Sequence, residues 1–152
     1  MSAPSAIEHD CFLSYRHIDD LGPGGQPGQG WVTQFHQAFS VKLGEYLGRA
    51  PRVWRDPRVT GNDVFPAQLN DRVRSSAVLL PIVSPGYRAS EWCRREFVAF
   101  REQAELDRRW TIANKLAVMK VVRTPLDDDE HQTFCAERLR FVSTGTEATM
   151  SA

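Results

Sequence analysis

The sequence predicts an α/β domain of three layers, with a central parallel sheet of about five strands flanked by helices. The first observation is that short apolar runs alternate four times with segments whose apolar residues recur at helical spacing. This alternation is typical of parallel strands joined by helical crossovers. The second is size and composition: 152 residues, 41% of them hydrophobic, suffice for one compact domain with one core.

The first strand and helix are predicted from the N-terminal third. Asp10–Tyr15 is a mostly apolar run typical of a buried strand. Residues 21–30 hold five of the ten glycines, which predicts a flexible loop. Apolar side chains then recur at every fourth position and predict an amphipathic helix that ends near Gly48. These side chains are Trp31, Phe35, Phe39, Leu43 and Leu47.

A second strand and helix follow. Residues 52–55 are predicted as a short second strand, and the turn-rich loop 56–63 comes after it. Phe65, Leu69 and Val73 are spaced for a second helix. Pro66 is tolerated there because N–H groups in the first turn of a helix have no hydrogen-bond partner within the helix, so the missing N–H group of proline costs nothing.

The third strand is predicted at residues 77–83, whose nearly continuous apolar character indicates burial on both faces. Pro81 cannot donate to a ladder, so we expect it where one neighbouring strand is missing. Residues 84–86 end this strand, and Ser90 is the expected N-cap of a long helix that reaches about Leu106. Residues 116–122 are predicted as the fourth strand and 139–142 as a fifth, edge-like strand.

The predicted organisation is an N-terminal extension at 1–9, one domain at 10–142 and, at 143–152, a tail or a linker to a further domain. The N-terminus lacks the basic-then-apolar pattern of a signal peptide. The longest apolar run, 77–83, is too short to cross a bilayer. We therefore expect a cytoplasmic chain without a membrane segment.

Several function classes are disfavoured. Lysine plus arginine equals aspartate plus glutamate, at 19 each, so no general attraction to nucleic acid is expected. Cys11, Cys93 and Cys135 are widely spaced, which favours free thiols over disulfides or a zinc site. The glycine-rich loop has neither a GK[ST] ending nor a GxGxxG pattern, and no GxSxG elbow occurs. We expect no metal and no bound cofactor.

The ligand site is expected outside the carboxyl ends of the strands, as in other open parallel sheets. On the long helix that follows the third strand, Trp92 and Glu96 lie one turn apart at the border of the apolar stripe. On an anonymous helix, such a glutamate would be a boundary carboxylate paired to Arg95 or Arg101.

Four short motifs resemble the Toll/interleukin-1 receptor (TIR) domain family, in the family's order and at similar spacings. They are Asp10-Cys11-Phe12-Leu13-Ser14-Tyr15-Arg16, Trp54-Arg55-Asp56, Ser84-Pro85 and Ser90-Glu91-Trp92-Cys93-Arg94-Arg95-Glu96. The resemblance covers about residues 10–122 and is to the bacterial type of domain. It implies a flavodoxin-like fold. Where the family continues into a last helix, no such helix is visible after Pro125.

The resemblance also implies candidate functions and site residues. The family contains both signalling scaffolds and NAD⁺ glycohydrolases, and the catalytic members place a tryptophan four residues before the catalytic glutamate. Glu96 matches that glutamate. NAD⁺ would then be a substrate rather than a cofactor, cleaved to nicotinamide and to ADP-ribose or its cyclic form. Candidate substrate-binding residues are Tyr15, Arg16, His17, Trp54, Asp56, Phe65, Ser84 and Trp92.

The proposed chemistry needs only one carboxylate. Nicotinamide leaves NAD⁺ as a neutral molecule, so its departure requires no general acid, whereas ordinary glycosidases use two carboxyl groups. The transition state resembles an oxocarbenium ion, whose positive charge a carboxylate such as Glu96 can stabilise. Trp92 would supply an apolar wall beside it.

Alternative explanations exist for most of these residues. Arg16 could be a solvated charge, Asp56 could only cap a turn, and Phe65 could be core. For Trp54 we favour the core, and Ser14 is expected to have a structural hydroxyl. The chain as a whole could be a non-catalytic module that signals by contact between TIR domains, through the loop that carries Pro57 and Gly61. A weaker alternative is a hydrolase of another N-glycosidic bond.

Overall fold

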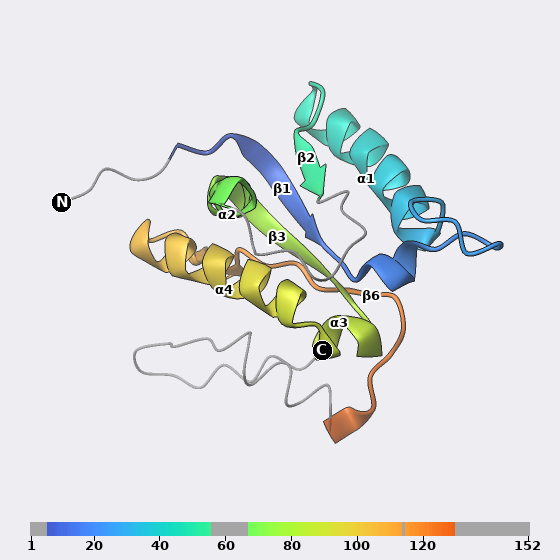
Figure 1. The fold of residues 1–152 in the computed structure, drawn as a ribbon. Coiled ribbons are helices and arrows are strands. Elements are labelled where there is room, and N and C mark those ends of the chain that lie inside the picture. Colours follow the sequence, from blue (N-terminus) through green and yellow to red (C-terminus); the bar gives the residue numbers. More distant parts are fainter. Residues whose placement is uncertain (1–5, 56–66, 114, 130–152) are drawn as a thin grey trace.

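The computed structural model describes residues 6–55, 67–113 and 115–129 (Figure 1). Four parallel strands form the central sheet in the order β2-β1-β3-β6. They are β1 (His9–Ser14), β2 (Val53–Arg55), β3 (Ser76–Val83) and β6 (Val121–Val122). The predicted α/β fold with a parallel sheet is thus confirmed. The fifth strand predicted at 139–142 and the tail at 143–152 lie outside the described residues.

Helix α1 (Trp31–Leu47) covers one face of the sheet (Figure 1). Odd-numbered residues of β1 point to this face because successive strand side chains alternate. Cys11 and Leu13 pack there with side chains of β3 and α1 in one apolar cluster. The helix ends as predicted, since Gly48 caps it with a φ of 69°, a left-handed conformation that glycine adopts without a steric penalty.

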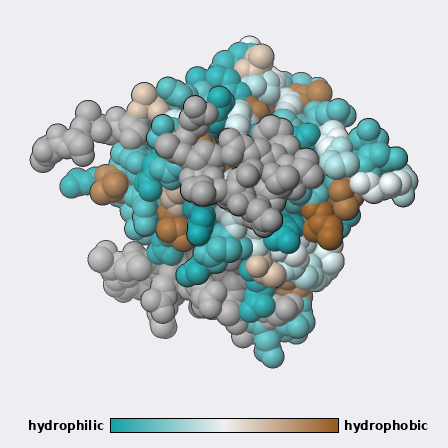
Figure 2. Space-filling view, viewed as in Figure 1, coloured by the Kyte–Doolittle hydropathy of each residue, from teal (hydrophilic) through white to brown (hydrophobic). Residues whose placement is uncertain are grey.

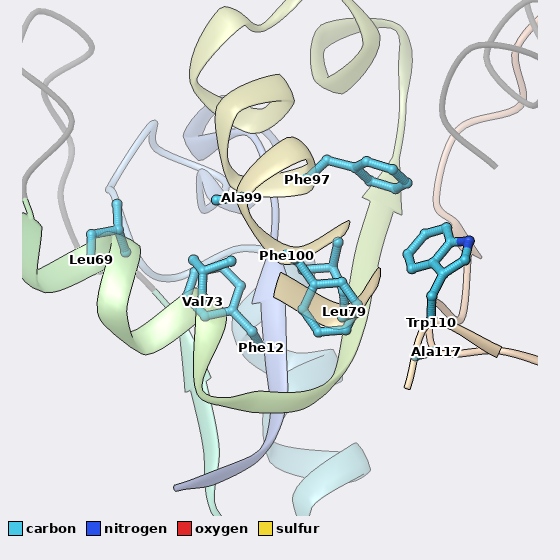
Figure 3. Packing of buried hydrophobic residues seen from close by; sticks show 10 residues of the cluster. Phe12, Leu69, Val73, Leu79, Phe97, Ala99, Phe100, Trp110 and Ala117 are labelled. Atoms are coloured by element: carbon cyan, nitrogen blue, oxygen red, sulfur yellow. The ribbon is translucent and has the colours of Figure 1, made fainter. Parts of the chain in front are cut away.

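Helices α2 (Ala67–Arg74) and α4 (Glu91–Leu106) cover the opposite face and complete the three layers (Figure 1). Phe12 and Leu79 point from the two central strands toward these helices (Figure 3). The cluster they enter is the larger core of the protein. Its other buried members are Leu69, Val73, Phe97, Ala99, Phe100, Ala104, Trp110 and Ala117.

Pro81 lies at a position where the strand ladder is interrupted on one side, in keeping with its missing N–H group. The backbone groups of Leu79 and Val83 bond toward the β6 side of the sheet, to Ala117, Met119 and Arg123. Pro81 lies midway between them and therefore faces the same side. The neighbouring chain has no strand assignment at residues 119–120, so the missing N–H group falls at a gap in the ladder.

The strand predicted at 116–122 is interrupted. Its beginning belongs to β5 (Lys115–Leu116), which forms an antiparallel hairpin with β4 (Thr111–Ile112). An isolated bridge then joins Val118 to β3, and only β6 joins the sheet as a strand. The apolar run therefore indicates strands in this region but not their extent, and hydropathy carries no information on which neighbour a strand pairs with.

Two short helices follow the central strands. A 3-10 turn, η1 (His17–Asp20), comes after β1, and α3 (Pro85–Ala89) comes after β3. The break predicted at residues 84–86 is thus the start of a helix. Ser90 is the N-cap of α4, as predicted, because its hydroxyl accepts a hydrogen bond from the backbone N–H of Cys93 at 3.2 Å.

On the face shown in Figure 2, hydrophobic residues are scattered among hydrophilic ones outside the grey region. Among the described helices, none is both long and apolar enough to cross a bilayer.

Candidate functional site

The carboxyl ends of β1 and β3 meet at one edge of the sheet, as the predicted topology required. Ser84, after β3, places its hydroxyl 2.5 Å from the carboxylate of Asp19 in η1. The same hydroxyl accepts a hydrogen bond from the N–H of Tyr87 and so begins α3. A Cβ on Gly86 would lie 3.4 Å from Cγ of Arg16. The structure therefore brings Arg16 and Ser84, two predicted site residues, close together.

A buried hydrogen bond ties α3 to the end of β1. The hydroxyl groups of Ser14 and Tyr87 are 2.9 Å apart, and both side chains are fully buried. The structural role expected for the Ser14 hydroxyl is confirmed. Since only Ser90 separates α3 from α4, this bond also holds the start of α4 against the sheet.

The α1 side of this edge contains a polar network around Asp20. Asp20 is 2% exposed, and its carboxylate accepts hydrogen bonds from the backbone N–H and the hydroxyl of Thr33, both at 2.7 Å. Arg55, at the end of β2, donates to it at 3.2 Å. The guanidinium also lies 5.7 Å from the ring centre of Tyr15. The network joins η1, α1 and β2, and its hydrogen bonds with Thr33 and Arg55 offset the cost of burying the Asp20 carboxylate.

Sequence reasoning did not find this network. In the sequence, Arg55 is only part of a strand motif, and Asp20 stands between the first predicted strand and the glycine-rich loop. Their partners lie 13 to 35 residues apart in the chain, so no local spacing signals the contacts. Tyr15 is buried by this arrangement, and its ring also meets His17 edge-on at 5.2 Å.

Trp54 lies on the α2–α4 side of the sheet. Its ring centre is 5.2 Å from that of Phe12, and the guanidinium of Arg72 lies 4.9 Å from it. It packs against the larger core, which agrees with the core explanation favoured for this residue. Asp56 and Phe65, also predicted to bind substrate, lie outside the described residues.

Trp92 and Glu96 occupy the first half of α4. Trp92 packs, partly buried, against the larger core, and Glu96 is only 2% exposed. The arginines considered as its alternative partners form ion pairs with other glutamates of the same helix. Arg95 pairs with Glu91 at 4.0 Å, and Arg101 pairs with Glu105 at 2.9 Å. The side chain of Arg95 is more than half exposed, so it extends away from the interior that contains Glu96.

An open groove of about 420 Å³ lies between α2 and α4. Its lining side chains are mostly charged and come from the outer faces of the two helices; neither Trp92 nor Glu96 is among them. It is therefore distinct from the candidate site at the strand ends. The described part of the chain contains no cluster of side chains suited to hold a metal ion.

Burial also sets the chemistry of two other groups near the sheet. It raises the pKa of the Cys11 thiol to about 12, so this thiol is protonated and unreactive at neutral pH. Cys93 is likewise a buried thiol that forms no disulfide, as predicted, whereas Cys135 lies outside the described residues. Burial, together with the charge of Arg55, lowers the pKa of His36 in α1.

Comparison with known families settles what kind of domain this is. A family model described as the TIR domain matches residues 31–139, well over half of the chain. The chain belongs to the TIR domain family. The matched range includes three of the four motifs recognised in the sequence, among them the one that carries Trp92 and Glu96. No curated protein matches the chain.

Membership of the family defines the general role. TIR domains act in signal transduction and commonly associate with one another, and the family includes members that cleave NAD⁺. In this TIR domain, the predicted site residues that the structure describes fall into two groups. Tyr15, Arg16, His17 and Ser84 gather at the strand ends, and Trp92 and Glu96 lie on the adjoining helix.

Proposed function

We propose that this TIR domain is an NAD⁺ glycohydrolase in which Glu96 stabilises the ribosyl cation. One observation carries the proposal: a carboxylate that is 2% exposed lies one helical turn after a tryptophan, in the first half of the helix at the ligand-binding end of the sheet. Glutamate is rarely buried this completely, and buried ionisable groups beside a ligand-binding edge are frequent at functional sites.

The chemistry follows from that position. As the bond between nicotinamide and ribose breaks, positive charge develops on the ribose, and nicotinamide leaves without needing a proton. A carboxylate held in a poorly hydrated site interacts with such a charge more strongly than it would in water. Glu96 would stabilise the charge, and Trp92 would exclude water from one side of the ribose. Water or the adenine ring would then attack, giving ADP-ribose or its cyclic form.

Arg16 is the candidate for binding the diphosphate. It directly follows β1, its side chain is exposed, and it lies against the first turn of α3. A guanidinium binds phosphate oxygens through paired hydrogen bonds. His17 is adjacent, whereas the hydroxyl of Ser84 is engaged by Asp19 and Tyr87 and would contribute mainly by shaping the loop. We place this activity in the cytoplasm, in bacterial immune or cell-death signalling that self-assembly switches on.

The main alternative is a TIR domain that signals by contact alone. The specific observation in its favour is the same burial of Glu96, because a carboxylate must reach the substrate to act on it. On this hypothesis Glu96 is dispensable, and the loop that carries Pro57 and Gly61 is essential.

The test is nicotinamide release from NAD⁺ by the purified domain, measured by chromatography. We would compare the wild type with Glu96→Gln, which preserves the size of the side chain but removes the charge and replaces one acceptor oxygen with an NH2 donor. Glu45→Gln is the matched control, since Glu45 is a solvent-exposed glutamate on α1. We expect loss of about 100-fold or more in rate for Glu96→Gln and none for the control. Each variant is also fused to a tetrameric coiled coil, so that a requirement for assembly is met.

Two results would count against the proposal. Equal nicotinamide release by the wild type and Glu96→Gln would show that this carboxylate is not catalytic. Absence of release by the wild type, both alone and in the forced tetramer, would reject NAD⁺ cleavage and leave the contact-only alternative.

A further inference from the structure

The two aspartates of η1 hold this turn on either side of β1. Asp19 accepts a hydrogen bond from the hydroxyl of Ser84, which follows β3. Asp20 accepts hydrogen bonds from Thr33 at the start of α1 and from Arg55 at the end of β2. A 3-10 turn this short has little stability of its own. The position of η1 is therefore set by its contacts with α1 and with the ends of the two strands that flank β1.

Arg16 is the residue whose direction depends on this turn. Its carbonyl oxygen accepts a hydrogen bond from the N–H of Asp19 at 2.9 Å, which closes η1. Its exposed side chain passes the first turn of α3, where a Cβ on Gly86 would lie 3.4 Å from its Cγ. A shift of η1 relative to α3 would therefore move the guanidinium of Arg16.

We propose that Asp20, paired with Arg55, is a positioning residue that holds Arg16 in place for the diphosphate of NAD⁺. This role rests on the proposed function, in which Arg16 binds that diphosphate. The carboxylate of Asp20 is engaged by Thr33 and Arg55, so it acts through Arg16 and not on the substrate itself. Arg55 contributes to the same role from the end of β2.

The energetics of the pair favour a role in geometry. The side chains of Arg55 and Asp20 are only 20% and 3% exposed, so both lose most of their hydration on folding. A buried ion pair often contributes no more stability than apolar side chains of similar volume, because burying charges is costly. Its hydrogen bonds are directional, however, and fix the groups that they join. A ligand-binding group that is already fixed loses less conformational entropy when the ligand binds.

The end of the glycine-rich loop supports the same interpretation. A Cβ at Gly30 would lie 2.7 Å from Cα of Asp20 and 2.7 Å from the backbone nitrogen of Leu21, which is closer than such atoms approach. Glycine therefore lets the loop return directly against the end of η1, just before α1 begins. Gly30 matches no phosphate-binding pattern, and it serves instead to bring α1 close enough for the contact between Thr33 and Asp20.

The test separates KM from kcat for nicotinamide release, using the full chain alone and fused to the tetrameric coiled coil. We expect Asp20→Asn to raise KM for NAD⁺ by about tenfold or more, because the bonds of Arg16 with the diphosphate are weakened. It should change kcat little, since Glu96 lies on a different element. A merely structural role would give the opposite pattern. Partial unfolding reduces the number of active molecules, so the apparent kcat falls and KM stays the same.

Two further variants make this comparison sharper. Thr33→Val keeps the shape of the side chain and removes one hydrogen bond to Asp20, so KM should rise by a smaller factor. Asp10→Asn is the matched control, because Asp10 is also paired with an arginine, Arg49, but at the amino end of the sheet. This control should lower stability without changing KM.

A double-mutant cycle tests whether Asp20 acts through Arg16. Once Arg16→Ala has removed the guanidinium, Asp20→Asn should have little further effect on KM. The proposal is overturned if the two substitutions multiply in full. It is also overturned if the wild type cleaves NAD⁺ and Asp20→Asn leaves KM unchanged.

Binding of ADP-ribose, measured by isothermal titration calorimetry, is a readout that does not require cleavage. Asp20→Asn should weaken this binding by about the same factor as it raises KM. If the wild type binds ADP-ribose but releases no nicotinamide, the proposed catalysis fails, and calorimetry still decides the role of Asp20. If the wild type neither binds nor cleaves, both proposals are rejected.

Discussion

At the scale of residues, the described part of the chain contains two carboxylates that are almost completely buried, and their surroundings differ. Asp20 is compensated by Thr33 and Arg55, so its charge serves to hold η1, α1 and β2 together. Glu96 lies on the other side of the sheet, beside the larger core. Because burial of a carboxylate is costly, both positions require an explanation, and for Glu96 we propose a catalytic role.

A third carboxylate, Asp10, makes stability depend on pH. Its hydrogen bonds with the Arg49 guanidinium lower its pKa from 3.8 to about 2. A lowered pKa stabilises the fold above the pKa of the unfolded chain, and this stabilisation is lost as pH falls toward 2. Asp10→Asn should therefore lower the melting temperature near neutral pH by roughly 2–4 °C, since the pair is partly exposed.

The measurement is thermal unfolding by circular dichroism, from neutral pH down to about pH 2. The difference between the wild type and Asp10→Asn should shrink between pH 4 and pH 2. A difference that stays constant over this range would mean that the ion pair with Arg49 is not its source.

At the scale of elements, the start of α4 is fixed by its N-cap. Ser90 accepts a hydrogen bond from the N–H of Cys93, one of the four N–H groups that the first turn leaves without a helical partner. The turn that follows carries Trp92, and the next carries Glu96. The cap therefore contributes both to helix stability and to the position of the proposed catalytic residue.

Removing this cap should weaken the domain measurably. Ser90→Ala is expected to cost about 1 kcal/mol in the free energy of unfolding, determined by urea denaturation. Ser90→Thr should regain most of it, because a threonine hydroxyl also caps and places no charge at this buried position. If the threonine variant were as unstable as the alanine variant, the cap would not be what stabilises this end.

At the scale of the whole molecule, stability depends on the central strands, which are covered on both faces. Leu79 is fully buried in β3, where it lies against the helices of the larger core (Figure 3). Truncating it leaves a cavity that the surrounding layers cannot close. We expect Leu79→Ala to reduce the free energy of unfolding by about 2–5 kcal/mol.

Val41→Ala is the control for that substitution, since Val41 is 62% exposed on α1. It should change the free energy of unfolding by about 0.5 kcal/mol or less. Denaturant titration of the three proteins measures both effects. Equal losses for Leu79→Ala and Val41→Ala would contradict the assignment of the larger core.

Across these scales, the sequence alone determined the structural features that depend on residues only a few positions apart in the chain. The alternation of strands and helices, the glycine that ends α1 and the cap at Ser90 are local signals of this kind. Pro81 could also be placed, because its missing N–H group restricts it wherever it occurs. The order of the strands then predicted that the residues after β1 and β3 would meet, and Arg16 and Ser84 do.

Only the tertiary structure decided which distant groups are partners. It split the apolar run at 116–122 between a hairpin and the sheet, and it joined Asp20 to Arg55, 35 residues away. It also packed Trp54 against the core and left Val98 of α4 exposed to solvent. Spacing along the chain specifies the face of an element on which a residue lies. What covers that face depends on how the whole chain packs, which local periodicity does not encode.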